Sequence, residues 1–162
     1  MRWEAFAEAC PEIATLARER FARDELLMLG TIRRDGSPRV SPCEVDFAAG
    51  RIILGMMWRS RKALDLLRDP RATVHSVPTD RMNRDGDVKL YGTAMDEQDP
   101  VVRRAYHDEI IRRIDWAPKE PRHHVFSLDV ERAAFVRFGD DAVVWTWDPE
   151  RGLRTKPFPR ED

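Results

Sequence analysis

The sequence predicts an α+β fold, mainly antiparallel β-sheet, in the form of a small closed or split β-barrel with flanking helices. The chain has 162 residues, enough to bury one core and too few for two ordinary domains. Hydrophobic residues make up 42% and charged residues 35%, which is typical of a globular protein. The expected helices fall between groups of strands instead of after every strand, which disfavours a doubly wound parallel sheet. We therefore expect a single domain over residues 1–162, with an N-terminal helix over 1–23, a barrel core over 26–148 and a tail over 149–162 along the surface.

Three helices are expected from apolar residues at helical spacing. The first covers residues 3–23, with Pro11 in the first turn of its main part and the earlier residues as a separate turn, because a proline in mid-helix would break the hydrogen-bond ladder. The second is short and begins after Ser60, whose hydroxyl we expect to accept from backbone N–H groups of the first turn. It ends at Asp69, because the residue before a proline is pushed out of helical geometry. The third covers residues 99–114.

Eight strands are expected, and most of their connections are turns that favour antiparallel hairpins. They cover residues 26–34, 38–47, 51–57, 71–77, 87–97, 124–130, 133–138 and 143–147. The strand over 38–47 carries polar residues on both faces, which fits either the border of a ligand or subunit interface or an edge strand at the rim of the sheet. The segment 78–86 is polar and contains Pro, Asn and Gly, so it is expected to be a loop.

Composition narrows the class of protein. The net charge is −1, with basic and acidic residues interspersed, so neither a nucleic-acid partner nor a membrane surface is indicated. The first residues are acidic where a signal peptide would be apolar, and no apolar run reaches the length of a membrane span. Cys10 and Cys43 do not form a CxxC motif and are expected to be free thiols. A cytoplasmic protein is expected.

Two common kinds of active site are disfavoured. His123 and His124 are adjacent in an expected strand and so point to opposite faces, and the sequence has no HExxH or CxxC motif, so no metal site is predicted. No GxSxG motif is present either, and no serine is paired in sequence with a base, which argues against a serine hydrolase.

An anion site is the chemistry that the sequence favours. Ser60, Arg61 and Lys62 open the second helix, where free backbone N–H groups and the helix dipole attract negative charge. Basic side chains oppose the dipole at a helix start, which costs a few tenths of a kcal/mol or more. A bound anion would explain their placement, because arginine grips phosphate in a bidentate fork and lysine adds a point charge. The alternative is an ordinary solvated first turn.

Three stretches resemble a known family. SRKALDLLRDPRATVHS, over residues 60–76, is similar to the phosphate-binding segment of the pyridoxamine-5'-phosphate-oxidase-like split-barrel flavoproteins. DGSPRVSPCEVDF, over 35–47, resembles the second strand of that family, and KLYGTAMDE, over 89–97, resembles its G-x-A strand. The resemblance covers about residues 27–97, with a weaker match of the last strands. It implies a split barrel of the FMN-binding type and a homodimer with two cofactor sites at the subunit interface.

The resemblance also implies roles for residues around the phosphate of FMN or a deazaflavin. Arg61 and Lys62 would hold the phosphate, and Ser60 would assist them. On the second strand, Arg39, Val40 and Ser41 would lie near the phosphate or the ring.

Further residues are implied along the cofactor. Met56, Met57 and Trp58 would line its side. His75 and Ser76 would approach the ring or the substrate from either subunit. No catalytic side chain is predicted.

The function implied is that of an oxidoreductase that uses FMN, or else coenzyme F-420, to transfer hydride to or from a small organic substrate. Oxidation of pyridoxamine phosphate itself is not expected, because the terminal GLRTKPFPRED lacks the Arg-rich substrate motif of the founding oxidases. One alternative is a non-catalytic module that binds flavin or haem for storage, sensing or protection, with His75, His123 or His124 as an axial ligand. Another is a barrel with a degenerate site that acts only through dimer contacts.

Overall fold

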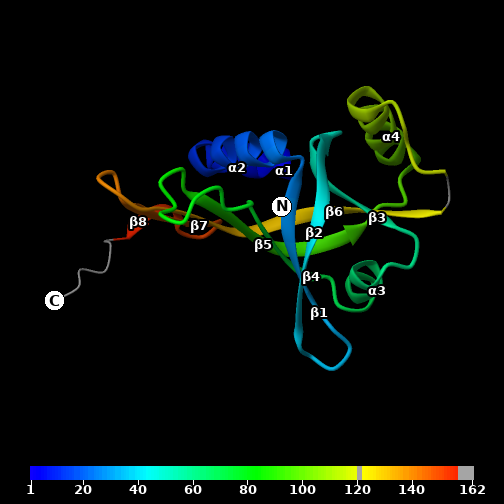
Figure 1. The fold of residues 1–162 in the computed structure, drawn as a ribbon, viewed down its shortest axis with the longest axis horizontal. Helices are drawn as coiled ribbons and strands as arrows, with labels where there is room; N and C mark the ends of the chain where they lie inside the picture. Colours follow the sequence, from blue (N-terminus) through cyan, green and yellow to red (C-terminus); the bar gives the residue numbers. More distant parts are fainter. Residues whose placement is uncertain (120–121, 157–162) are drawn as a thin grey trace.

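The structure is a computed structural model, and it describes residues 1–119 and 122–156 (Figure 1). Its helices are α1 (Trp3–Ala9), α2 (Pro11–Asp24), α3 (Arg61–Arg68) and α4 (Pro100–Ile114). Its strands are β1 (Leu26–Ile32), β2 (Pro38–Ala48), β3 (Arg51–Met57), β4 (Arg71–His75), β5 (Asp87–Asp96), β6 (His123–Arg137), β7 (Val143–Asp148) and β8 (Gly152–Lys156).

Six antiparallel strands close into a barrel. The sheet runs in the order β3-β2-β1-β4-β5-β6-β7-β8, and a further pairing of β3 with β6 closes the first six of these strands into a ring. The last two strands extend the sheet beyond the barrel, at the end of the molecule away from α3 and α4 (Figure 1). This architecture confirms the predicted α+β split barrel with flanking helices. Closure leaves few exposed strand edges, which protects an antiparallel sheet from edge-to-edge association.

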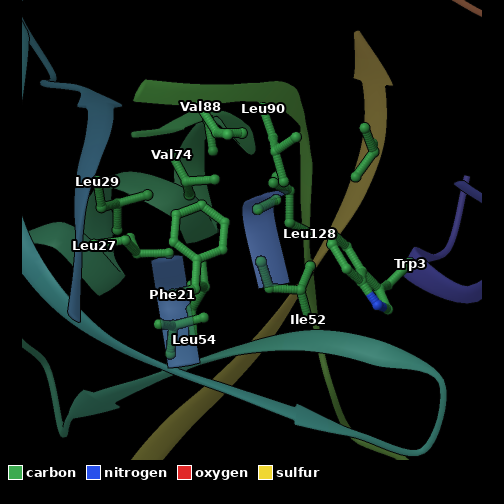
Figure 2. Close-up of a cluster of buried hydrophobic side chains, with 14 of the residues drawn as sticks. Trp3, Phe21, Leu27, Leu29, Ile52, Leu54, Val74, Val88, Leu90 and Leu128 are labelled. Atoms are coloured by element: carbon green, nitrogen blue, oxygen red, sulfur yellow. The ribbon is translucent and has the colours of Figure 1, made fainter. Parts of the chain in front are cut away.

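The barrel interior holds the main core. Buried and more exposed residues alternate along β1 and β5, as expected for strands with one face inward. The ring of Phe21, from α2, lies among Leu27, Leu29 and Val74 in the middle of the barrel (Figure 2). A second, smaller core lies outside, where Ile53 of β3 packs against α4. The strand β3 is therefore buried on both faces, which explains its continuous apolar run.

The predicted N-terminal helix is two helices. Cys10 has φ −148° and ψ 70°, which breaks the helix between α1 and α2. Pro11 then occupies the first turn of α2, as predicted, where its missing N–H costs nothing. The residues before it, expected as a separate turn, form the seven-residue α1.

The two strands predicted over 124–130 and 133–138 are one strand, β6. Residues 131 and 132, which separate the two predicted strands, lie at a β-bulge. Tyr91 of β5 pairs with Arg132 and Gly92 with Val130, so that Glu131 is the extra residue. A bulge interrupts the alternation of side chains without ending the strand, which is why the sequence looked discontinuous here.

The prediction of a surface tail over 149–162 is wrong for its first part. Gly152–Lys156 is the strand β8, which pairs with β7. The Asp148 carboxylate accepts hydrogen bonds from the backbone N–H groups of Glu150 and Arg151, and Gly152 has φ 65°, so a tight turn forms. The remaining residues of the terminal GLRTKPFPRED segment lie outside the described part of the chain.

A glycine on β3 allows α4 to dock closely. A Cβ atom added to Gly55 would lie 1.7 Å from the hydroxyl oxygen of Tyr106 and 2.8 Å from its Cζ, so something must shift. We expect Gly55→Ala to lower the free energy of unfolding by about 1–3 kcal/mol, measured by urea denaturation. Adding Tyr106→Phe removes the nearer atom and should recover part of that loss. If the losses of unfolding free energy for the two single variants simply add in the double variant, the close contact between these residues would be contradicted.

No helix in the described part of the chain has both the length and the apolar character needed to cross a bilayer.

Candidate functional site

The predicted anion site lies in the turn between β3 and α3. The strand ends at Met57, Arg59 takes a left-handed conformation with φ 55°, and Ser60 precedes the first helical residue. The turn is closed by a hydrogen bond of 3.1 Å from the Ser60 N–H to the Met57 carbonyl oxygen. We call Ser60, Arg61 and Lys62 the cradle.

The Ser60 hydroxyl does not cap the helix, so that prediction is wrong. Its Oγ is buried and has no hydrogen-bond partner within the described residues. The helix therefore keeps first-turn N–H groups without a side-chain cap, as an anion at this end would require. A buried hydroxyl without a partner is uncommon and calls for an explanation, such as a ligand that is absent here.

The neighbouring wall of the site is the first half of β2. Lys62 Nζ donates to the Pro42 carbonyl oxygen at 2.5 Å, which turns this lysine toward the strand. The Oγ of Ser41 is buried and, like that of Ser60, finds no partner in the part of the chain described. Of the two interpretations of β2, the edge strand is wrong, because β2 lies between β1 and β3 in the sheet order. Residues 38–44 pair with β1 and residues 44–48 pair with β3. Residues 38–43 pair with β1 alone, which leaves their other side to the cradle.

A buried carboxylate fastens α3 to this wall. Asp65 Oδ2 accepts from Arg39 Nε at 2.6 Å and from the Thr31 hydroxyl at 3.1 Å, while Asp65 Oδ1 lies 3.4 Å from Arg68. Burial works to raise the pKa of Asp65, but the hydrogen bonds from Arg39 and Thr31 outweigh it and hold the pKa below its ordinary value. Asp65 was not among the site residues predicted from the sequence. Its position between Leu64 and Leu66, in a short helix with an apolar side, was the available sign.

Beside the cradle lies a cleft of about 830 Å³ with a strongly basic lining. We call it the arginine cleft, and it is lined by Arg33, Arg34, Asp35, Arg39, Arg61, Leu64, Asp65 and Arg68. Five guanidinium groups face two carboxylates there, so the cleft suits a ligand with negative charge. The sequence predicted Arg39 and Arg61. It did not predict Arg33, Arg34 and Arg68, which the β1–β2 hairpin and the C-terminal end of α3 place in the cleft.

The three residues predicted along the side of the cofactor point in different directions. Met56 is buried in the barrel core, while Met57 is 80% and Trp58 53% exposed. Val40 of β2 is also exposed, at 66%. The indole of Trp58 stacks on the ring of His124, with centroids 4.7 Å apart and planes at 8°.

His75, the last residue of β4, and Ser76, which follows it, already have partners within the protein. The Ser76 hydroxyl is buried and accepts from the Val88 N–H at 3.0 Å. His75 Nδ1 lies 2.6 Å from the carbonyl oxygen of Ser76, and its Nε2 lies 3.4 Å from Asp87. Neither residue lines the arginine cleft.

The other two histidines considered as haem ligands are also engaged. His124 Nε2 accepts from the backbone N–H of Arg59 at 3.1 Å. His123 Nε2 lies 3.4 Å from Arg103 of α4. Ligation of haem iron by the Nε2 atom of either histidine would need its contact to break. Among residues 1–119 and 122–156, no group of three or more His, Cys, Asp or Glu side chains is arranged to hold a metal ion.

Comparisons with known proteins agree with this architecture. A family model described as pyridoxamine 5'-phosphate oxidase matches residues 13–137. A search of curated proteins finds no match.

Three solved structures illustrate the similarity. A haem-binding protein from Mycobacterium smegmatis is 22% identical with a TM-score of 0.68, over 86% of this chain and 59% of that one. A pyridoxamine 5'-phosphate oxidase-related, FMN-binding protein from Nostoc punctiforme is 14% identical with a TM-score of 0.63, over 96% of each chain. PhzG from Burkholderia lata, in complex with tetrahydrophenazine-1-carboxylic acid, is 16% identical with a TM-score of 0.64, over 91% of each chain. The chain thus spans less than two thirds of the Mycobacterium protein, and at these identities the likeness shows the fold.

Proposed function

This chain belongs to the pyridoxamine 5'-phosphate oxidase family, and from that premise we propose that it is an oxidoreductase dependent on FMN or the deazaflavin coenzyme F-420. It would transfer hydride between that cofactor and a small organic substrate other than pyridoxamine phosphate. FMN is the first choice of cofactor. The observation that carries the proposal is the arginine cleft beside an uncapped helix start, with two buried hydroxyls that lack partners among the described residues.

The residues present fit the phosphate of such a cofactor. Arg61 would grip its oxygens from the mouth of the cleft, and first-turn N–H groups of α3 would donate to it. The hydroxyls of Ser41 and Ser60 would supply two further donors and would gain the partners they lack. Lys62, held by the Pro42 carbonyl oxygen, would add positive charge nearby. The cofactor supplies the hydride chemistry, and the protein binds and orients it.

A second copy of the chain is the partner that we propose. Val40, Met57 and Trp58 are exposed around the site, and Leu67 of α3 is exposed as well. Large apolar side chains grouped on a surface are typical of an interface. A homodimer that covers them would shield the cofactor ring from water. We expect a mass of two chains in solution, and a monomer that binds cofactor fully would contradict this part. We propose no nucleic-acid or membrane partner.

The cytoplasm is the compartment that we propose. Cys10 and Cys43 are both free and buried, and burial raises the pKa of Cys43 to about 11. Unpaired thiols suit a reducing environment.

The test is a titration of the purified protein with FMN and with F-420, followed by fluorescence or absorbance. Binding of neither cofactor below about 1 mM, which corresponds to roughly 4 kcal/mol, would overturn the proposal. If a cofactor binds but is never turned over with any donor or acceptor, the non-catalytic module is the better interpretation. A Soret band on addition of haem, lost in a variant of a single histidine, would support its haem-binding form.

The cradle can be tested by a double variant. We expect Arg61→Ala with Lys62→Ala to weaken FMN binding about 100- to 10,000-fold, since charge-assisted hydrogen bonds to phosphate contribute roughly 1.5–3 kcal/mol each. Affinity for riboflavin, which lacks the phosphate, should change little. The matched control is Arg104→Ala with Arg112→Ala, which removes two exposed charges from α4. FMN affinity that is equal in both double variants would leave the phosphate assignment without support.

A further inference from the structure

The turn that leads into the cradle is held by a residue from a distant part of the chain. His124 lies on β6, opposite Met56 of β3. Its Nε2 accepts a hydrogen bond of 3.1 Å from the Arg59 N–H, and its ring stacks on Trp58. Arg59 is also the residue with the left-handed φ of 55°, a conformation that a non-glycine residue adopts only when its surroundings hold it there. His124 thus contacts the one strained residue between β3 and the cradle.

The contact with Arg59 specifies the chemical form of the histidine. A backbone N–H can only donate, so His124 Nε2 must be an acceptor. A neutral imidazole has one acceptor nitrogen, whereas an imidazolium has none. The ring is therefore neutral and carries its hydrogen on Nδ1. Protonation would place an N–H at Nε2 that points at the Arg59 N–H, and the hydrogen bond would be replaced by a repulsion.

The surroundings of the ring favour this neutral form. His124 is 8% exposed and lies against Phe126, with ring centroids 6.0 Å apart. Burial is the main effect and lowers the pKa of His124. Asp96 of β5 acts in the opposite direction, and Arg103 of α4 lowers the pKa further.

We propose that His124 is a positioning residue for the cradle: its neutral ring holds the turn from Trp58 to Ser60 in the geometry that begins α3, and its protonation releases that turn and weakens anion binding. The identity of the anion rests on the function proposed above, whereas the role of His124 in holding the turn is independent of that function. A release of the turn would move Ser60, and with it the start of the helix whose N–H groups face the anion.

The direction of the pH dependence follows from the lowered pKa. An ordinary histidine titrates near 6.5. Because burial in the folded protein lowers the pKa of His124, the closed form is favoured fully above pH 6.5 and is lost as the pH falls from there through the lowered value. The cradle is thus expected to be formed at neutral pH and released in mild acid.

The first experiment needs no cofactor. The fluorescence of Trp58 is obtained as the difference between the wild-type protein and Trp58→Phe, and it is followed from pH 8 to pH 5. We expect one step with a midpoint below about 6.5, because Trp58 stacks on the ring that is protonated. The step should vanish in His124→Gln, whose side chain can still accept the Arg59 hydrogen bond but does not titrate. A step that persists in His124→Gln, or no step in the wild type, would overturn the proposal.

The second experiment measures FMN affinity over the same pH range in the wild type, His124→Gln and His124→Leu. The phosphate of FMN gains its own proton near pH 6, an effect common to all three proteins. We expect the wild type to lose about tenfold more affinity than His124→Gln between pH 7.5 and pH 5.5. His124→Leu should be weak throughout, since it lacks an acceptor, and thermal melts of the apo proteins show whether the variants are folded.

The outcomes separate the two proposals. Parallel pH profiles in the wild type and His124→Gln would refute the role of His124 while leaving cofactor binding intact. Absence of FMN binding together with the Trp58 step would refute the proposed cofactor and sustain the hold of His124 on the turn.

Discussion

A Phe21→Ala variant is expected to lose about 3–5 kcal/mol of the free energy of unfolding. Phe21 comes from α2 and is fully buried, and its ring fills the middle of the barrel among residues from β1, β3 and β4 (Figure 2). Alanine would leave a cavity enclosed by strands that are tied to one another by closure and so collapse little. Because domains are stable by only about 5–15 kcal/mol, this is a large share of the total.

Urea denaturation followed by circular dichroism measures the effect, as a lower midpoint with an unchanged slope. The control is Val101→Ala, at a residue on α4 that is 71% exposed, for which we expect a change within about 0.5 kcal/mol. A loss for Phe21→Ala as small as that of the control would show that the α2 ring does not support the barrel.

Replacement of Asp65 should have the second largest effect, because it acts on stability and on the site together. Asp65→Ala leaves Arg39 and Arg68 without their shared carboxylate, and we expect a loss of about 2–3 kcal/mol. This lies below the usual loss for a broken buried pair, because both arginines are partly exposed and water screens their charge. We also expect weaker FMN binding, since Arg39 would no longer be fixed at the cleft.

The pH dependence identifies the carboxylate as the cause. The pKa of Asp65 is lower in the folded protein than the unfolded value of about 3.9. Its stabilisation is therefore complete well above pH 4 and is lost as the pH falls through the folded pKa. The difference in stability between the wild type and Asp65→Ala should shrink below about pH 4. Asp69→Ala, at a partly exposed carboxylate just after α3, is the matched control and should leave FMN affinity unchanged.

Local pattern was enough to predict most strands, the place of Pro11 in the first turn of α2 and the start of α3 after Ser60. The misses share one cause, which is that pairing across the sheet decides them. Glu131 looks like part of a connection, and only the pairing of β5 with the residues on either side of it shows that it is the extra residue of a bulge. Likewise, Arg33 and Arg34 look like ordinary hairpin residues, and only the packing of α3 against β1 places them beside Arg61.

The burial of Asp65 is a second feature that local sequence pattern could not predict. A carboxylate in a short helix is normally solvated, and no spacing rule announces that Thr31 and Arg39 will surround it. Its partners lie more than 25 residues away in sequence, so only the folded barrel reveals why it is buried.

The pairing of β3 with β6, which closes the barrel, also bears on the order in which the parts of the protein form during folding. The β3–β6 ladder ends with Met57 opposite His123, 66 residues later in the chain, and the turn into the cradle starts at the next residue. Contacts of such long sequence separation carry a large loop-closure entropy and form late in folding. Hairpins such as β1–β2 can exist in an unfinished chain, whereas we expect the cradle to require β6, which carries His124. Binding of an anion at the cradle would therefore indicate that the barrel has closed, which makes ligand binding a measure of complete folding.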